Sequence, residues 1–302
     1  MAITTKLDGK VALVTGASSG IGRGVALALA ACGSHVFVNY PGPQEEHKAA
    51  EVLRTLRDSG GSGALVEGDV SDEAAVKGMF GKVLAHNGRL DILINNAGIA
   101  RSALVQDITL DDWNAVFAVH MTGTFLCTRQ ALPTMFAQNA GRIISTASQL
   151  AYKGAPGFAH YTAAKGAILS FTRSLTLEIG ERNVTANCVA PGATMTPILE
   201  DVPDDVLEGI RQGIPRGQLA QVEDIVDSYV FLASDSAGHY RGQCLSPNGG
   251  DVFLSILRSV LPSRARAGKR KSVIQSSGPG RESVSQSLHD IRLVRNTFPP
   301  AP

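Results

Sequence analysis

Short runs of almost continuous apolar residues alternate along the chain with longer stretches in which apolar residues recur at helical spacing. A run that is apolar at nearly every position is typical of a parallel strand covered on both faces. The predicted strands are 11–15, 35–40, 63–69, 91–95, 141–148 and 184–191, and 243–250 adds one more strand and a turn. The predicted helices between them are 20–32, 44–58, 72–87, 111–138 and 158–180.

This alternation indicates an α/β fold, with one doubly wound parallel sheet, helices on both faces and right-handed crossovers. The chain has 302 residues, of which 44% are hydrophobic, and this is enough to build one large core. We therefore expect a single folded domain over residues 1–253.

The character of the chain changes after Phe253, where Ser, Gly, Pro and Arg become frequent. Residues 255–302 hold nine basic and two acidic side chains, a net charge of +7, which leaves −6 for residues 1–254. Such a segment buries too little apolar surface to offset its ordering entropy, so we predict a basic, disordered tail over 254–302. A short helix over 252–261 is the one element expected there. The basic stretch 264–271 is interpreted as solvated tail, with nuclear targeting or an anionic surface as the alternative.

Composition excludes several classes of protein. The net charge of +1 gives no general attraction to nucleic acid or an anionic membrane. The four cysteines are far apart without a C-x-x-C pair, which suits neither a disulfide framework nor a metal site. The N-terminal stretch lacks the apolar core of a signal peptide, and no apolar run reaches membrane-spanning length. We expect a soluble, cytoplasmic protein with no metal.

The stretch "TGASSGIG" (15–22) follows the first predicted strand and opens the first helix. Glycine at 16, 20 and 22 lets the backbone turn tightly and approach a pyrophosphate, which meets the free N–H groups of the helix N-terminus. This is the first turn of a Rossmann-type βαβ unit, where a dinucleotide site belongs. The predicted cofactor-binding residues of this loop are Gly16, Ser18, Ser19, Gly20, Ile21 and Gly22.

The end of the second strand bears on the choice of dinucleotide. An acid at this place would bind the 2′-hydroxyl of the NAD ribose and repel the 2′-phosphate of NADP. The chain has Asn39 there, followed by Tyr40 and Pro41. We therefore predict that Asn39 lines the ribose site, that NADP(H) is preferred and that NAD(H) is the second candidate.

Six motifs in order resemble the short-chain dehydrogenase/reductase family: "TGASSGIG", "GDV" (68–70), "NNAG" (95–98), Ser148, "YTAAK" (161–165) and "PGATMT" (191–196). The resemblance spans about residues 7–253, and 3-oxoacyl-[acyl-carrier-protein] reductases and sugar or polyol dehydrogenases are the most similar members. It implies hydride transfer between NAD(P)(H) and a small carbonyl or alcohol substrate. It also implies that Asp69 and Val70 hold the adenine, that Asn96, Ala97 and Gly98 line the ribose region, and that Pro191, Gly192, Thr194 and Thr196 contact the nicotinamide end. Asn95 and the glycines of these motifs also have a purely structural interpretation.

Tyr161 and Lys165 lie one helical turn apart and therefore share a helix face. Reduction of a carbonyl needs a general acid, and the reverse reaction needs a base. A free phenol has a pKa of about 10, which a neighbouring ammonium lowers. We predict Tyr161 as the acid/base, Lys165 as the charge that tunes it and holds the cofactor, and Ser148 as the donor to the substrate oxygen.

Two positions depart from the family pattern. His120 stands where the family has an asparagine that holds a water for proton relay. We hypothesise that its imidazole carries a proton near neutrality, and the alternative is a neutral histidine buried at a helix kink. Carrier-protein docking in the reductases uses two arginines, of which this chain has Arg182 and, at the other place, Asn139.

Three functions remain open on the sequence. The first is an NADP-preferring 3-oxoacyl-type reductase, the second is an NAD-dependent sugar, polyol or alcohol dehydrogenase, and the third is a dinucleotide-binding sensor without turnover. Residues 198–218 are expected to form the substrate lid. The resemblance also implies a homo-oligomer, a tetramer or dimer built on the helices 111–138 and 158–180.

Overall fold

The strands owe their unbroken apolar sequences to two separate hydrophobic layers, one on each face of the sheet. In the first strand, Ala12 and Val14 pack into one buried cluster, while Val11 and Leu13 pack into the other. Consecutive strand residues point to opposite faces, so a strand covered on both sides must be apolar at every position. The computed structural model describes residues 5–200 and 202–253, and both layers lie within them.

The sheet is wholly parallel and has the strand order β3-β2-β1-β4-β5-β6-β7. The order reverses between β1 and β4, the place where a doubly wound sheet binds ligands at the carboxyl ends of its strands. The strands are β1 (Val11–Val14), β2 (His35–Tyr40), β3 (Ser62–Glu67), β4 (Ile92–Asn95), β5 (Gly141–Thr146), β6 (Val184–Val189) and β7 (Cys244–Leu245). The predicted α/β class and doubly wound sheet are confirmed.

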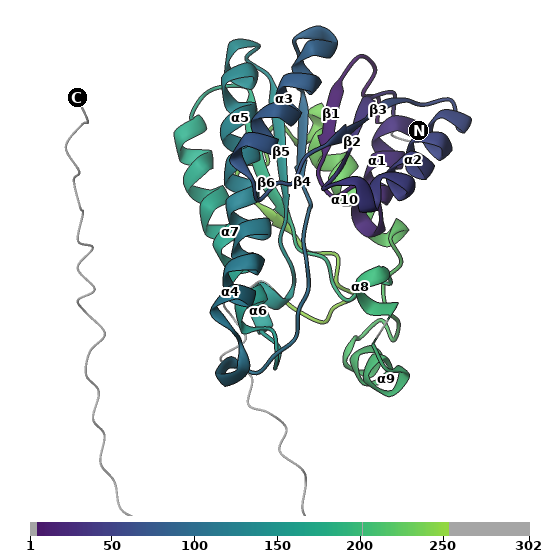
Figure 1. Ribbon diagram of the computed structural model, residues 1–302, viewed down its shortest axis with the longest axis vertical. Helices are drawn as coiled ribbons and strands as arrows, with labels where there is room; N and C mark the ends of the chain where they lie inside the picture. The colour runs from purple at the N-terminus through teal and green to yellow at the C-terminus, as the bar shows by residue number, and fades with distance from the viewer. Residues whose placement is uncertain (1–4, 201, 254–302) are drawn as a thin grey trace, which may run out of the picture. The chain divides into compact units, whose positions relative to one another are not determined.

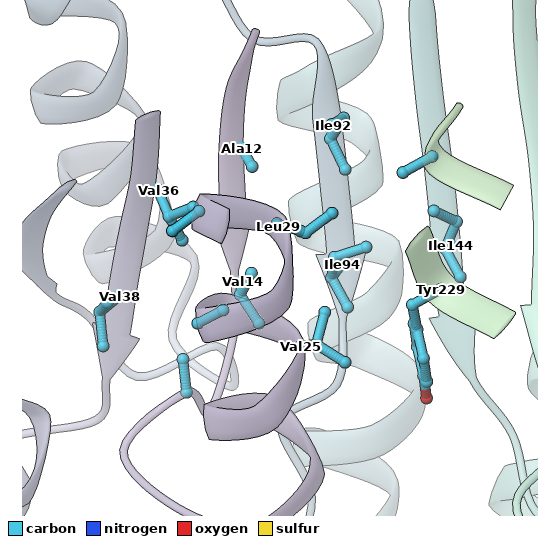
Figure 2. Close-up of a cluster of buried hydrophobic side chains, with 14 of the residues drawn as sticks. Ala12, Val14, Val25, Leu29, Val36, Val38, Ile92, Ile94, Ile144 and Tyr229 are labelled. Atoms are coloured by element: carbon cyan, nitrogen blue, oxygen red, sulfur yellow. The ribbon is translucent and has the colours of Figure 1, made fainter. Parts of the chain in front are cut away.

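Helices cover both faces of the sheet (Figure 1). One layer holds α1, α2 and α10, whose side chains pack with Ala12, Val14, Ile94 and Tyr229 in the cluster of Figure 2. The other holds α3, α5 and α7. The helices are α1 (Gly20–Ala31), α2 (Pro43–Asp58), α3 (Glu73–Asn87), α4 (Leu110–Phe117), α5 (Gly123–Ala137), α6 (Leu150–Lys153), α7 (Ala159–Ile179), α8 (Pro197–Glu200), α9 (Asp204–Gly213) and α10 (Glu223–Ala233), with 3-10 turns at Val105–Asp107 and Asp235–Ala237.

The predicted helix 111–138 is wrong as one element. A π turn, η2 (Ala118–Thr122), separates α4 from α5 and carries His120. The Thr124 hydroxyl, at the start of α5, donates to the His120 carbonyl at 2.7 Å. Apolar residues continue through the whole stretch, so periodicity alone does not reveal the extra residue.

The predicted lid, 198–218, contains α8 and α9, which lie with α6 at the lower end of the view in Figure 1. The predicted boundary at residue 253, the tail over 254–302, most of the helix 252–261 and the basic stretch 264–271 lie outside the described residues. No helix in the part of the chain that the structure describes is long and apolar enough to cross a bilayer.

Candidate active site

The glycine loop between β1 and α1 is shaped by close backbone contacts. Gly16 and Gly20 have φ of 60° and 54°, a conformation that side chains disfavour. A Cβ atom on Gly16 would lie 2.7 Å from the Ala97 Cα, and one on Gly22 would lie 2.3 Å from the Gly16 carbonyl oxygen. Each glycine is therefore required by its surroundings, and the loop leads directly into the first turn of α1.

Asn39 holds this loop from beneath. Its Oδ1 accepts from the Gly16 N–H at 3.1 Å, and its Nδ2 donates to the carbonyl oxygens of Gly68 at 2.9 Å and Val66 at 3.2 Å. The residue is 1% exposed. The amide of Asn39 thus joins the glycine loop to the end of β3, and its role at the ribose site stays a prediction.

Asn96 joins the loop to the end of β4. Its Nδ2 donates to the carbonyl oxygens of Thr15 and Gly16, both at 3.1 Å, while the Thr15 hydroxyl accepts from the N–H groups of Asn96 and Ala97. Asn95 points into the core, where its amide donates to the hydroxyls of Thr128 and Ser145. Asn95 is thus structural, and Ala97 packs directly against the glycine loop.

Other predicted cofactor residues lie around the same sheet edge. Asp69 is exposed after β3 and accepts from the N–H and hydroxyl of Ser71, while Val70 is buried against Gly123. Thr194 is buried, with its hydroxyl donating to the Gly192 carbonyl. Thr196 lies against Gly20, since a Cβ atom there would be 3.5 Å from the Thr196 side chain. Pro191 is buried, and Ile21 packs against the core.

The catalytic candidates come from β5 and α7. Ser148 follows β5, and its oxygen accepts from the Leu150 N–H at 3.1 Å. Tyr161 lies in the first turn of α7: burial raises the pKa of the phenol, and a hydrogen bond with Ser148 opposes that rise. The two predicted residues are therefore in contact.

Lys165 lies on the same face of α7, with its Nζ 5.7 Å from the centre of the Tyr161 ring. The ammonium donates to the Thr146 carbonyl at 2.6 Å. Burial lowers the pKa of Lys165 to about 7. The Thr146 hydroxyl in turn lies 2.8 Å from the Tyr229 hydroxyl and donates to Asn96 Oδ1 at 3.4 Å. Thr146 thus links the lysine to the residue that holds the glycine loop.

His120 meets Tyr161 edge-on, with 5.3 Å between the ring centres. The histidine is 2% exposed, and its Nε2 lies 2.8 Å from the Ile99 carbonyl oxygen and 3.2 Å from the Ile99 backbone nitrogen. Nδ1 has no partner within the described residues. Burial, with the charge of Lys165, lowers the pKa of His120 to about 3. A ring with this pKa is neutral near pH 7, which supports the alternative of a neutral histidine buried at a helix kink, while the proton-carrying role stays a hypothesis.

One polar contact of the glycine loop was not predicted from the sequence. The Ser18 hydroxyl donates to Glu45 Oε2 at 2.9 Å, so an acid from the first turn of α2 contacts the glycine loop.

In residues 5–200 and 202–253 no group of three or more His, Cys, Asp or Glu side chains is placed to hold a metal ion.

Comparison with known proteins agrees with this geometry. The family model described as Enoyl-(Acyl carrier protein) reductase matches residues 16–251. The 3-oxoacyl-[acyl-carrier-protein] reductase of Synechocystis sp. is 40% identical over 250 residues, 82% of this chain and 99% of the relative. The 3-oxoacyl-[acyl-carrier-protein] reductase FabG of Staphylococcus aureus is 38% identical over 241 residues. These residues are 80% of this chain and 97% of the relative.

A solved structure adds a second kind of relative. A Beutenbergia cavernae protein, described as an NAD(P) dependent gluconate 5-dehydrogenase and solved with NADP bound at low occupancy, is 36% identical to this chain. It superposes with a TM-score of 0.77 and covers 81% of this chain and 97% of its own. The similarity thus extends over both the glycine loop and the catalytic candidates.

Proposed function

The chain belongs to the short-chain dehydrogenase/reductase family, and we propose that within it the protein is a 3-oxoacyl-type reductase that prefers NADP(H) over NAD(H). Membership makes it an NAD(P)(H)-dependent oxidoreductase that interconverts a carbonyl and an alcohol. The observation that carries the proposal is the grouping of Ser148, Tyr161 and Lys165 beside the glycine loop.

The glycine loop fits a dinucleotide because it turns tightly between β1 and α1 and ends at a helix N-terminus, whose N–H groups can meet a phosphate. The positive φ of Gly16 and Gly20 and the close packing of Gly16 against Ala97 support this assignment. The loop residues Gly16, Ser18, Ser19, Gly20, Ile21 and Gly22 would hold the phosphates, and Asp69 and Val70 would hold the adenine. Asn96, Ala97 and Gly98 would line the ribose region, and Pro191, Gly192, Thr194 and Thr196 would contact the nicotinamide end. When bound, the nicotinamide supplies or takes up the hydride.

Tyr161 would act as the proton donor during reduction. Burial raises the pKa of its phenol, so the side chain is protonated at neutral pH and has a proton to give. The Ser148 hydroxyl, whose oxygen is already bound to the Leu150 N–H, would donate to the substrate oxygen as negative charge develops there. Lys165 would stabilise the phenolate left after the transfer, since its ammonium lies over the Tyr161 ring.

The choice of a 3-oxoacyl substrate rests on the names of the relatives in Synechocystis and Staphylococcus. Delivery on a carrier protein has weaker support. The Arg182 guanidinium stacks on Phe136 at 4.5 Å, and Asn139, in place of a second arginine, accepts from the Asn183 N–H. A free thioester is therefore the substrate form that the proposal favours.

An NAD-dependent sugar or polyol dehydrogenase is the second candidate. The specific observation that favours it is the likeness to the Beutenbergia cavernae protein, at 36% identity and a TM-score of 0.77. A dinucleotide-binding sensor without turnover is the third, and the contact of Ser148 with Tyr161 argues against it.

We also propose that the protein is a cytoplasmic homo-oligomer, a dimer or tetramer. Large apolar side chains on α5 and α7 support an interface there, with Phe125 41% and Leu177 83% exposed. Light scattering after size exclusion would measure the assembly, and replacing both residues by serine should lower the mass. A monomeric parent protein would contradict this part of the proposal.

The function is tested by following nicotinamide absorbance with purified protein, giving NADPH and NADH in parallel with a 3-oxoacyl thioester analogue. We expect faster oxidation of NADPH, and panels of gluconate-type sugars, polyols and simple alcohols as poor substrates. Turnover confined to sugars or alcohols with NAD⁺ would overturn the reductase in favour of the second candidate. Binding of either cofactor without turnover of any substrate would favour the sensor.

A further inference from the structure

We propose that Glu45 sets the discrimination between NAD(H) and NADP(H) by placing a carboxylate at the adenosine ribose. This inference rests on the proposed function, because it concerns the same dinucleotide site. Glu45 lies in the first turn of α2, directly after the loop that leaves β2. Its carboxylate reaches back to the glycine loop, where Oε2 accepts from the Ser18 hydroxyl at 2.9 Å.

The position is the one that ribose recognition requires in this type of sheet. In a βαβ dinucleotide site, an acid that follows the second strand binds the ribose hydroxyls next to the glycine loop. Asn39 stands at the end of that strand, but its amide is turned under the loop and bound to Gly16 and Gly68. Glu45 brings an acid to the loop from the next helix instead, and contacts it through a residue of the loop itself.

The charge of Glu45 is balanced only in part. Its Oε1 accepts from the Lys48 ammonium at 2.9 Å, and the two side chains are 25% and 48% exposed. The hydrogen bond with Lys48, followed by that with Ser18, lowers the pKa of the Glu45 carboxyl, so it is ionised at neutral pH. Two ribose hydroxyls can donate to an ionised carboxylate, whereas a 2′-phosphate is repelled by it. Lys48 offsets part of that repulsion, so NADP(H) remains the preferred cofactor, while Glu45 keeps the preference over NAD(H) smaller than an uncharged residue would.

The test is a calorimetric titration of full-length protein with NADP⁺, NAD⁺, 2′,5′-ADP and 5′-AMP. Glu45→Gln keeps an oxygen that accepts from Ser18 and removes the charge. Glu46→Gln is the matched control, because it removes the same charge from the same helical turn at an exposed position. We expect Glu45→Gln to raise the affinity ratio of NADP⁺ over NAD⁺ by about tenfold, with the same trend in the fragments, and Glu46→Gln to change it less than about twofold.

The alternatives give different results. An equal loss of affinity for all four ligands in Glu45→Gln would show a purely structural contact with Ser18 and overturn the inference. If Glu45→Gln and Glu46→Gln changed the affinity ratio of NADP⁺ over NAD⁺ equally, the effect would come from general surface charge, and the inference would be overturned. If the parent protein binds neither NAD⁺ nor NADP⁺, the dinucleotide function itself fails and the inference with it. Cofactor binding with an unchanged ratio in the variant removes the role of Glu45 alone.

Discussion

The glycine loop and the catalytic cluster lie at the same edge of one sheet, yet their buried polar groups differ in how many hydrogen bonds they make. Around the loop, the side-chain amides of Asn39 and Asn96 bind backbone carbonyls, and Asn39 also binds the Gly16 N–H. Around Tyr161, three side chains carry buried polar atoms with no partner in the described part of the chain: His120, His160 and Thr162. The two regions therefore differ in how completely the protein alone satisfies them.

This difference separates two tasks. A loop that must approach phosphates closely needs one fixed backbone, and full hydrogen bonding fixes it before any ligand arrives. A catalytic centre needs donors that have no partner within the protein and an acid whose pKa is set by its surroundings. These features lower the stability of the folded protein. Changes in the loop should mainly affect folding and binding, and changes in the cluster should mainly affect turnover.

The largest expected effect is on turnover. Ser148→Ala removes the donor to the substrate oxygen and two bonds within the protein, the one from the Leu150 N–H and the one with Tyr161. We expect kcat to fall about 10²–10³-fold while the melting temperature stays within about 2 °C. The exposed Ser170 of α7 provides a matched control, Ser170→Ala, which should leave both quantities unchanged. A kcat within threefold of the parent would remove Ser148 from the mechanism.

The opposite pattern is expected at the loop. Asn39→Ala leaves the Gly16 N–H and the Gly68 carbonyl without their buried partner, and we expect a loss of roughly 2–4 kcal/mol in the free energy of unfolding. Denaturant titration measures it, and Asn114→Ala on the exposed face of α4 is the control. If Asn39→Ala shifted the NADP⁺ to NAD⁺ ratio with full stability, the ribose role predicted from the sequence would be supported.

Lys165 should make stability depend on pH. Its pKa is lowered by burial to about 7, below the value of about 10.5 expected in the unfolded chain. Between these values the unfolded state binds more protons, so stability rises with pH from about 7 to 10. Lys165→Met removes the titrating group, and the difference in unfolding free energy between parent and variant should change across this window and level off below pH 7. A constant difference from pH 6 to 10 would contradict the lowered pKa.

The smallest effect is expected at His120. Because burial lowers the pKa of this imidazole to about 3, it does not titrate in the working range. His120→Asn should therefore leave the midpoints of the pH–rate profile within about 0.3 units, with stability changed by less than about 1 kcal/mol. A shifted midpoint between pH 5 and 8 would support the proton-carrying hypothesis.

Much of this arrangement could be predicted from the sequence, because it follows from local patterns. Continuous apolar runs locate the strands, and the glycine spacing locates the loop. The alternation along β2 could also have placed Asn39 correctly: Val36 and Val38 face one layer, so Phe37 and Asn39 face the other, where α3 covers them. A residue on that face lies under the glycine loop, where the Asn39 amide binds the Gly16 N–H.

Other features are set by tertiary contacts that no local pattern encodes. The π turn at His120 changes neither composition nor apolar spacing. From the sequence, Glu45 is indistinguishable from a solvated acid at the start of a helix. Its hydrogen bond with Ser18 forms only because the fold places α2 beside the glycine loop. The lowered pKa of Lys165 depends on how completely α7 and β5 bury the ammonium, which spacing along the chain does not give.

Cofactor binding and proton transfer are carried by different residues of this site, and Tyr161→Phe tests that separation directly. The phenol hydroxyl contacts Ser148 and is not part of the hydrogen bonds that hold the glycine loop. The measurement is NADPH binding by fluorescence together with single-turnover reduction of a 3-oxoacyl thioester analogue. We predict a dissociation constant within about threefold of the parent and a reduction rate lower by about 10³-fold. Reduction at the parental rate would contradict the assignment of Tyr161 as the acid, and with it the proposed mechanism.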